Sequence, residues 1–392
     1  MHNNGDKMKA LVLTTHTRST SVEDVPRPIP KPGEVLIRVK AIALNPVDQI
    51  YVSTPIATQE KRVIGTDFAG VVVEASPELG GSSNPRAKPG TRVAGFLQGA
   101  CSVNDRPGAF AEYITAPYDL IWAIPPGMSL EEASTVSMCS LTAAQGLYSR
   151  LGLQNPFSGS QTENDTAKPI NVFIYGSSTS VGLYAAQLVH LSASASGTKI
   201  QLIGAASKSK HDVLRQEPYS YDVLVDYHAA DWVEQVKAAT GGNGVDFALD
   251  CISEGATVYG THDTLATEAK FAVFRGPVGG RYDPSKLRIK PIYGAVWEGL
   301  GVEIGYNGTV IPASQEALEF ARQYFDFLSV GTPLGRSRIE PNPVRIMPGG
   351  FERVVPDGFA LLGSGSVSQR SNVKGGEGHM RPISAEKLVY QV

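Results

Sequence analysis

The order of apolar and polar residues follows two different patterns in two parts of the chain. In the first, short apolar runs are separated by turn-forming pairs such as Pro32-Gly33 and Pro89-Gly90. Such runs predict β-strands joined by tight turns. The predicted strands lie at residues 10–14, 35–42, 70–74, 93–96 and 109–115. We expect them to form an antiparallel, partly barrel-like domain, followed by a helix over residues 131–151.

In the second pattern, which starts at Pro169, predicted strands alternate with predicted helices. One amphipathic helix follows the first strand, and another is predicted over residues 230–240. This βαβ order is typical of a doubly wound parallel sheet. The predicted strands lie at residues 170–175, 199–206, 223–227, 245–252 and 271–274.

The alternation ends near residue 331. Residues 350–362 predict a helix, residues 363–380 a Gly/Ser-rich loop, and residues 383–392 an apolar strand that packs back on the first domain. A polar stretch at residues 154–168 marks a domain boundary. We therefore predict an α/β chain with domains at residues 1–160 and 161–330, and a C-terminal segment, residues 331–392, that returns to the first domain.

The first βα turn carries the clearest chemical signal. A β-branched run at residues 170–175 enters a turn of small residues from Gly176 to Gly182, and a helix follows. Such a turn presents backbone N–H groups, and the positive end of the helix, to a pyrophosphate. Ser178 stands where the usual fingerprint has its middle glycine, so an empty strand–helix connection remains an alternative.

The end of the second strand indicates which nicotinamide cofactor is bound. A site for NAD usually places an Asp or Glu there, to bind the ribose 2′-hydroxyl. The chain instead has Ser207, Lys208, Ser209 and Lys210, which can meet a 2′-phosphate with charge and hydroxyl donors. We therefore expect NADPH, with a solvated helix start as the alternative role of the two lysines.

Composition narrows the possible functions. The 392 residues carry a net charge of −3 with no basic stripe, which argues against nucleic acid as a partner. No apolar run approaches the ~20 residues that span a bilayer, and the N-terminus lacks the apolar core of a secretory signal. The three scattered cysteines form no disulfide framework, so we expect a cytoplasmic protein without membrane contact.

Short motifs spread over almost the whole chain carry a family resemblance. They are Leu44-Asn45-Pro46-Val47-Asp48, Gly65-Thr66-Asp67-Phe68-Ala69-Gly70-Val71-Val72, Gly108-Ala109-Phe110-Ala111-Glu112-Tyr113, the Gly176–Gly182 turn, Asp226-Tyr227, Leu249-Asp250-Cys251-Ile252 and Ile383-Ser384-Ala385-Glu386-Lys387-Leu388-Val389. The chain resembles zinc-free, quinone-oxidoreductase-like medium-chain dehydrogenase/reductases. Within them it is most similar to the stand-alone trans-acting enoyl reductases of fungal polyketide synthases. The resemblance implies a GroES-like catalytic domain beside a Rossmann domain.

Zinc can be excluded on the ligands alone. A catalytic zinc needs three protein ligands, and a structural zinc needs four closely spaced Cys or His residues. Zinc alcohol dehydrogenases of this fold carry an early cysteine and a later Gly-His-Glu, but the corresponding segments here are residues 45–48 and 65–67. Neither the three cysteines nor the seven histidines replace those ligands, so we expect no metal.

Without a metal, conjugate reduction is the simplest remaining chemistry. An α,β-unsaturated thioester accepts a hydride at its β-carbon, and the resulting enolate is protonated at the α-carbon. The resemblance implies the cofactor contacts. Val47, Asp48, Gln49 and Ile50 lie against the nicotinamide, Ser178, Thr179, Ser180 and Val181 hold the phosphates, Ser207–Lys210 hold the 2′-phosphate, Tyr227 contacts the adenosine side, and Phe274, Arg275, Ile383 and Ser384 lie near the cofactor.

The resemblance also implies that the acyl chain runs between the domains. Its expected contacts are Ala143, Ala144, Gln145, Gly146, Leu147, Tyr148, Ser149, Arg150, Gly294, Ala295, Val296, Trp297 and Glu298. Trp297 lies in a loop dotted with glycines, which favours a lining role over plain core packing. Asp67 is expected to fix a turn through an internal hydrogen bond.

The proton donor is an open question. Similar enzymes often have a lysine just after the Asn-Pro-x-Asp segment, where this chain has Ile50. Tyr51 is adjacent, but in an extended segment it points to the opposite face. Protonation by solvent, a donor such as Thr142 or Tyr148, and altered chemistry all remain possible. Each candidate also has a structural role, Tyr148 in packing and Thr142 in bonding to the backbone.

Three functions follow from this. The first is an NADPH-dependent trans-acting enoyl reductase that serves a polyketide synthase and acts, as a monomer, on a carrier-bound thioester. The second is a free-standing NADPH-dependent reductase of quinones, enones or carbonyls. The third is a weakly active cofactor-binding partner of a synthase complex. Dependence on a carrier protein separates the first from the second.

Overall fold

The computed structural model describes residues 6–157, 169–306, 309–331, 335, 337–363 and 378–392. Within them the chain forms two compact units, one of residues 1–138 with 297–392 and one of residues 139–296. Residues 139–160 thus belong to the second unit and residues 297–330 to the first. Most of the two polar stretches at 154–168 and 363–380 lies outside the described residues.

The strands of the first unit pair antiparallel except for β17, which pairs parallel with β18. Its larger sheet has the order β17-β18-β3-β5-β6-β8, with β7 paired to β3, and its smaller sheet has the order β2-β1-β4. The strands are β1 (Lys7–Thr14), β2 (Ser19–Pro26), β3 (Glu34–Ala43), β4 (Lys61–Val63), β5 (Asp67–Ala75), β6 (Arg92–Phe96), β7 (Tyr113–Pro117), β8 (Ile121–Ala123), β17 (Val344–Ile346) and β18 (Lys387–Gln391). The short hairpin β15 (Ile304–Tyr306) and β16 (Thr309–Ile311) completes the set.

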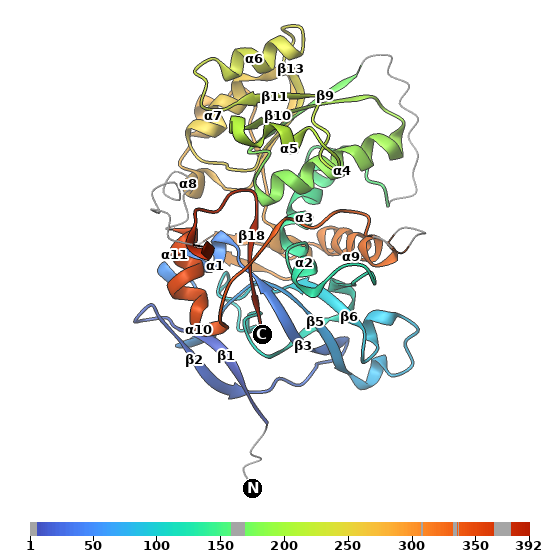
Figure 1. Ribbon diagram of the computed structural model, residues 1–392, viewed down its shortest axis with the longest axis vertical. Helices are drawn as coiled ribbons and strands as arrows, with labels where there is room; N and C mark the ends of the chain where they lie inside the picture. The colour runs from blue at the N-terminus through green and yellow to red at the C-terminus, as the bar shows by residue number, and fades with distance from the viewer. Residues whose placement is uncertain (1–5, 158–168, 307–308, 332–334, 336, 364–377) are drawn as a thin grey trace. The chain divides into compact units, whose positions relative to one another are not determined.

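The C-terminal strand returns to this sheet as predicted. β18 pairs antiparallel with β3, with Val389 opposite Ala43, and Figure 1 shows it among the N-terminal strands. Side chains such as Ile37, Phe68 and Tyr390 form the core that the strands enclose. The helices of the unit are α1 (Pro46–Ser53), α2 (Leu130–Ser134), α9 (Gln315–Val330), α10 (Phe351–Arg353), the π-helix η8 (Val354–Phe359) and α11 (Ala360–Leu362).

The second unit contains one six-stranded sheet in which every pair is parallel. Its strand order is β11-β10-β9-β12-β13-β14, the doubly wound order. The strands are β9 (Ile170–Tyr175), β10 (Ile200–Ala206), β11 (Val223–Asp226), β12 (Val245–Asp250), β13 (Leu265–Val273) and β14 (Ile292–Tyr293). The helices are α4 (Ser180–Ser196), α5 (His211–Leu214), α6 (Trp232–Ala239), α7 (Ala256–Asp263) and α8 (Pro277–Gly280) (Figure 1). This arrangement confirms the predicted α/β class.

Several predicted elements have different bounds. The strand expected at residues 109–115 begins only at Tyr113, although Ala111 forms an isolated bridge to Ala10. The single helix expected over residues 131–151 is three segments, α2, α3 (Ser137–Ala144) and the π-helix η4 (Gln145–Arg150). The hydroxyl of Thr135 donates to the carbonyl of Glu132 at 2.7 Å, and this competition with the helix ladder accompanies the break after α2.

Candidate active site

The turn after β9 has the geometry of an anion site. Gly176 adopts a left-handed φ of 77°, and the amides of Gly176 and Ser177 donate to the carbonyl of Ala205 on β10. Thr179 is the N-cap of α4, and its hydroxyl accepts from the amide of Gly182 at 3.1 Å. The helix dipole adds positive potential at the first turn of α4. Ser178, Thr179, Ser180 and Val181 are partly exposed.

The residues expected at the 2′-phosphate lie next to this turn. β9 and β10 are parallel neighbours, so the segments that follow them share one edge of the sheet. Ser207 precedes the 3-10 turn η5 (Lys208–Lys210), in which Lys208 and Ser209 are exposed. Cationic and hydroxyl side chains therefore follow β10 at the sheet edge where α4 begins.

Tyr227 follows β11 at the same edge. Its ring is 39% exposed and stacks on the ring of His228, with centroids 4.1 Å apart. Burial raises the pKa of the Tyr227 hydroxyl, and the charge of Asp226 adds to this effect. A partly exposed aromatic side chain at this edge is of the kind that stacks on a nucleotide.

Phe274 and Arg275 follow β13. Arg275 forms an ion pair with Glu254 at 3.0 Å, and the amide of Phe274 donates to the hydroxyl of Ser253. Asp250, at the end of β12, orders this region by accepting from the amide of Ser253 at 2.8 Å. Burial raises the pKa of Asp250 to about 6 in spite of these hydrogen bonds.

The structure brings together parts of the two segments expected to contact substrate. The side chain of Gln145 donates to the carbonyl of Val296 at 3.4 Å. Gly294 packs so closely on Arg150 that a Cβ at Gly294 would lie 2.1 Å from the guanidinium nitrogen Nη2. Residues of η4 and of the stretch ending at Val296 therefore meet inside the second unit.

The remaining expected substrate residues are placed as follows. Trp297 and Glu298 belong to the first unit, in η7 (Val296–Leu300). Trp297 is 2% exposed, and its ring lies 5.9 Å from that of Phe96, so it is packed in this unit's interior. The hydroxyl of Tyr148 donates to the carbonyl of Leu188 at 2.8 Å, while Thr142 is half-buried on α3.

The segment expected against the nicotinamide is a helix. Val47, Gln49 and Ile50 are partly exposed on α1, while Asp48 is buried. The extended geometry assumed for Ile50 and Tyr51 is therefore wrong: adjacent side chains on a helix lie about 100° apart. The signal was present in the sequence, because Asn45 at the N-cap, Pro46 at the first position and an acid at the third are helix-start residues.

A buried polar network underlies α1. The carboxylate of Asp48 accepts from the amide of Asn45 at 2.8 Å, and its Oδ1 has no hydrogen-bond partner among the described residues. The amide nitrogen of the Asn45 side chain donates to Thr66 and to Asp67, both at 2.8 Å. Asp67 thus makes the internal hydrogen bonds expected of it. Burial raises the pKa of Asp48 to about 7.

Lys387 completes this network, and the sequence analysis assigned it no role. Its ammonium donates to the Asp67 carboxylate, and the two side chains are 3% and 0% exposed. The available signal was a lone lysine at the start of the apolar run Leu388-Val389-Tyr390. Ile383 and Ser384 lie in the loop before β18, half-buried and exposed respectively.

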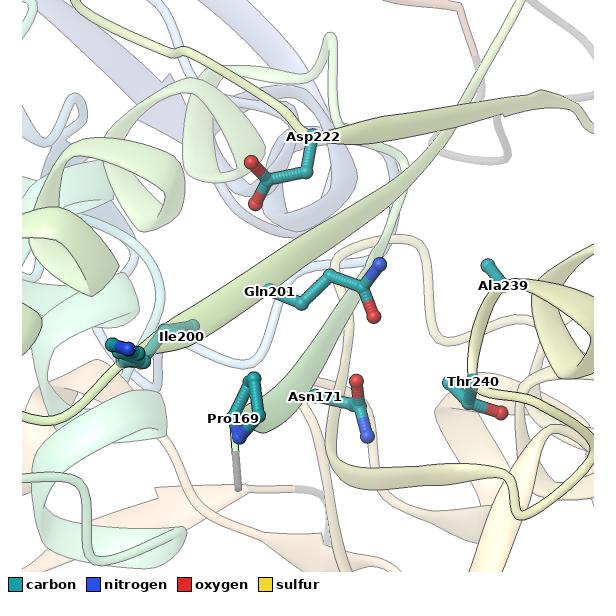
Figure 2. A pocket seen from close by; sticks show the side chains of 8 residues that line it. Pro169, Asn171, Ile200, Gln201, Asp222, Ala239 and Thr240 are labelled. Carbon is teal, nitrogen blue, oxygen red and sulfur yellow. The ribbon is translucent and has the colours of Figure 1, made fainter. Parts of the chain in front are cut away.

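A hollow elsewhere in the second unit is unrelated to this site. The hollow has a volume of about 370 Å³. Its lining residues, shown in Figure 2, include Asn171 on β9, Gln201 on β10 and Thr240 after α6. Pro169 and Ile200 place the hollow at the amino ends of the strands. Dinucleotides bind at the carboxyl ends of such sheets, so this hollow is not the cofactor site.

Nowhere in the described ranges do three or more His, Cys, Asp or Glu side chains gather in a way that could hold a metal ion. Cys101, Cys139 and Cys251 form no disulfide bond with one another. None of the helices in the described part of the chain is both long and apolar enough to cross a membrane.

Comparison with known proteins identifies the family. Residues 31–126 match the alcohol dehydrogenase GroES-like domain. Enoyl reductase cheB of Chaetomium globosum is 30% identical over 93% of this chain and 89% of its own length. The chain belongs to the enoyl reductase family. Trans-enoyl reductase ACTTS2 of Alternaria alternata is also similar to this enoyl reductase, with 29% identity over 92% of this chain and 96% of its own.

Solved structures agree with this family's fold. The CurK enoyl reductase has a TM-score of 0.69 at 17% identity, and covers 98% of this chain and 99% of its own. The mycobacterial protein Rv1454c, solved with NADPH, has a TM-score of 0.66 at 20% identity over 98% of this chain and 100% of its own. The GroES-like and Rossmann parts expected of this enoyl reductase are thereby confirmed.

Proposed function

We propose that this chain is a trans-acting enoyl reductase that uses NADPH to reduce the α,β-unsaturated thioester of a polyketide intermediate carried by a polyketide synthase. As a member of the enoyl reductase family it is an oxidoreductase that acts on a CH–CH group. The observation that carries the choice of NADPH is the sheet edge that joins the Gly176–Gly182 turn to Ser207, Lys208, Ser209 and Lys210. The structural neighbour Rv1454c was solved in complex with NADPH.

The turn and the lysines have separate roles in this proposal. Residues 178–181 hold the pyrophosphate at the N-terminus of α4, and Lys208 and Lys210 bind the 2′-phosphate. Tyr227 packs against the adenosine side, with Phe274, Arg275, Ile383 and Ser384 nearby. Val47–Ile50 of α1 lie against the nicotinamide end.

The bound cofactor supplies a hydride to the β-carbon of the thioester. The residues of η4, with those at 294–296, orient the acyl group. Orientation alone accounts for a large part of such a rate enhancement, because the reaction needs no strong acid or base before the hydride moves. We infer that water protonates the α-carbon, since Ile50 is a hydrocarbon and the Tyr148 hydroxyl already donates to Leu188.

The first test is NADPH oxidation with a short enoyl thioester. Purified protein is mixed with an α-methylcrotonyl pantetheine thioester, absorbance is followed at 340 nm in the standard way, and the saturated product is identified by mass spectrometry. We expect saturable turnover with NADPH and much slower turnover with NADH. Deuterium from NADPH labelled at C4 should appear at the β-carbon of the product.

Two parallel reactions distinguish the competing functions. A quinone and a free enone replace the thioester in one, and the same enoyl group on a carrier protein replaces it in the other. Faster reduction of the carrier-bound thioester supports the proposal, whereas equal or faster reduction of the quinone favours a free-standing reductase. Tight NADPH binding without turnover of any substrate would contradict the proposal and favour a cofactor-binding partner.

A further inference from the structure

Lys387 and Asp67 form a buried ion pair across the sheet of the first unit. Lys387 begins β18 and Asp67 begins β5, and β3 lies between these two strands. The second carboxylate oxygen, Oδ1 of Asp67, accepts from the amide of Met138 at 3.0 Å. Every oxygen of this carboxylate is therefore engaged, and the ammonium also approaches the carbonyl of Thr135 at 3.4 Å.

The ion pair is connected to the start of α1. Asp67 accepts from the side-chain amide of Asn45 with the same oxygen, Oδ2, that accepts from Lys387. Asn45 is the N-cap of α1. Its backbone amide donates to the carboxylate of Asp48, three residues further along the chain. Lys387 therefore reaches the first turn of α1 through two consecutive hydrogen bonds.

The physical consequence is a fixed helix start. A carboxylate that is wholly removed from water needs a compensating cation, and Lys387 supplies it. The compensated carboxylate then holds the Asn45 amide in one orientation, with Thr66 as the second acceptor at 2.8 Å. Pro46, at the first helical position, restricts the backbone further, so the direction of α1 depends on this pair.

We propose that Lys387 is a positioning residue, which acts through Asp67 and Asn45 to hold α1 for the nicotinamide end of the cofactor. This inference rests on the proposed function, which assigns Val47–Ile50 to that end. Lys387 itself touches neither substrate nor cofactor in this proposal. Its replacement should therefore affect the nicotinamide half and spare the half held by the α4 turn.

The test compares two ligands rather than rates. The dissociation constants of NADPH and of 2′-phosphoadenosine 5′-diphosphoribose, which lacks the nicotinamide ring, are measured by calorimetry. We expect Lys387→Met to weaken NADPH about tenfold, which corresponds to 1.4 kcal/mol, and to leave the fragment nearly unchanged. Lys387→Arg should restore most of the NADPH affinity, because it keeps the cation.

Asn45→Ala keeps both charges and removes the side-chain amide that joins Asp67 and Thr66 to the start of α1, so it carries the test if Lys387→Met does not fold. The double variant Asn45→Ala/Lys387→Met should then bind NADPH no more weakly than Lys387→Met alone, since both changes break one chain of contacts. Losses that multiply in the double variant would overturn the proposal.

Arg86→Met is the matched control. Arg86 is also a buried cation of the first unit, 3% exposed, and it pairs with Asp326 and donates to Ile121 at 3.1 Å, away from the Asn45 network. We expect it to lower stability without a selective loss of NADPH. Equal losses of NADPH and fragment in Lys387→Met, or the same selective loss in Arg86→Met, would show general destabilisation instead. Because the readout is binding, this outcome is independent of whether enoyl thioesters are reduced.

Discussion

Gly182 packs against the main chain of Gly176 so closely that a Cβ at Gly182 would lie 2.3 Å from the carbonyl oxygen of Gly176. The helix α4 therefore begins directly on the turn, and its first N–H groups are held at the sheet edge where the phosphates are proposed to bind.

Gly182→Ala should displace this turn. The added methyl group meets backbone rather than a flexible side chain, so we expect a loss of about 1–3 kcal/mol in the free energy of unfolding, as for overpacked cores. NADPH affinity should fall as well, and both effects can be measured by thermal unfolding with and without cofactor. Gly279→Ala is the control, because no atom lies within 4 Å of its Cβ. Equal Tm values for the two variants would contradict this prediction.

Removing the two lysines of η5 should change the cofactor preference. Hydrogen bonds to a charged group are worth about 1.5–3 kcal/mol each, so the loss of both in Lys208→Ala/Lys210→Ala should raise the KM for NADPH by about 100-fold or more. The KM for NADH should stay the same, because NADH has no 2′-phosphate. Lys237→Ala, at an exposed lysine on α6, should change neither value. A similar rise for both cofactors would refute the 2′-phosphate assignment.

Asp48 should make the protein less stable as the pH rises. Burial and, to a smaller extent, the charge of Asp67 raise its pKa, Asn45, Thr66 and Lys387 lower it, and the net result is a rise from 3.8 to about 7. Between these two values the folded state binds more protons than the unfolded state. The free energy of unfolding therefore falls as the pH increases through this window, and the effect levels off above about pH 7.

Asp48→Asn isolates that contribution. Asp250, whose pKa is raised to about 6, gives a slope of the same sign, so a comparison with the parent protein is needed. Cys101 lies near Asp48, and burial raises the pKa of its thiol well above the usual range, so it stays neutral. We expect the Tm difference between pH 5 and pH 8 to be smaller in Asp48→Asn than in the parent. An unchanged difference would mean that Asp48 is ionised throughout.

Tyr148→Phe should affect stability more than chemistry. The hydroxyl donates to the Leu188 carbonyl at 2.8 Å, and its loss should cost about 0.5–1.5 kcal/mol of unfolding free energy. If water is the proton source, kcat with the enoyl thioester should change by less than about twofold. A much larger fall in kcat, at a pH where the variant is fully folded, would identify Tyr148 as the proton donor.

The sequence predicted the second unit well because its signals are local. β9 is a continuous apolar run that ends directly in a turn of small residues, and both features lie within about a dozen consecutive positions. The absence of an Asp or Glu directly after β10 could be read from the sequence equally well. Parallel strands buried on both faces give such runs regardless of what lies elsewhere in the chain.

Other features were harder to read. Asn45 and Pro46 start a helix, and their residue types favour a helix start. The segment was nevertheless expected to be extended, because it was interpreted as a family motif and not as a helix cap. The pairing of Lys387 with Asp67 joins positions 320 residues apart, and no local pattern encodes it. Only the register of β18 against β3, and of β3 against β5, brings the two charges together.

The position of β18 has a consequence for synthesis. A ribosome has translated all of residues 139–296 before it reaches Lys387, so the second unit can fold on the nascent chain while the sheet of the first unit still lacks a strand. Until β18 has been synthesised, Asp67 lacks its counterion. Release of the polypeptide before β18 would leave an exposed sheet edge beside an uncompensated carboxylate. To the quality-control machinery of the cell, a truncated chain would therefore present a folded second unit joined to an incompletely folded first unit.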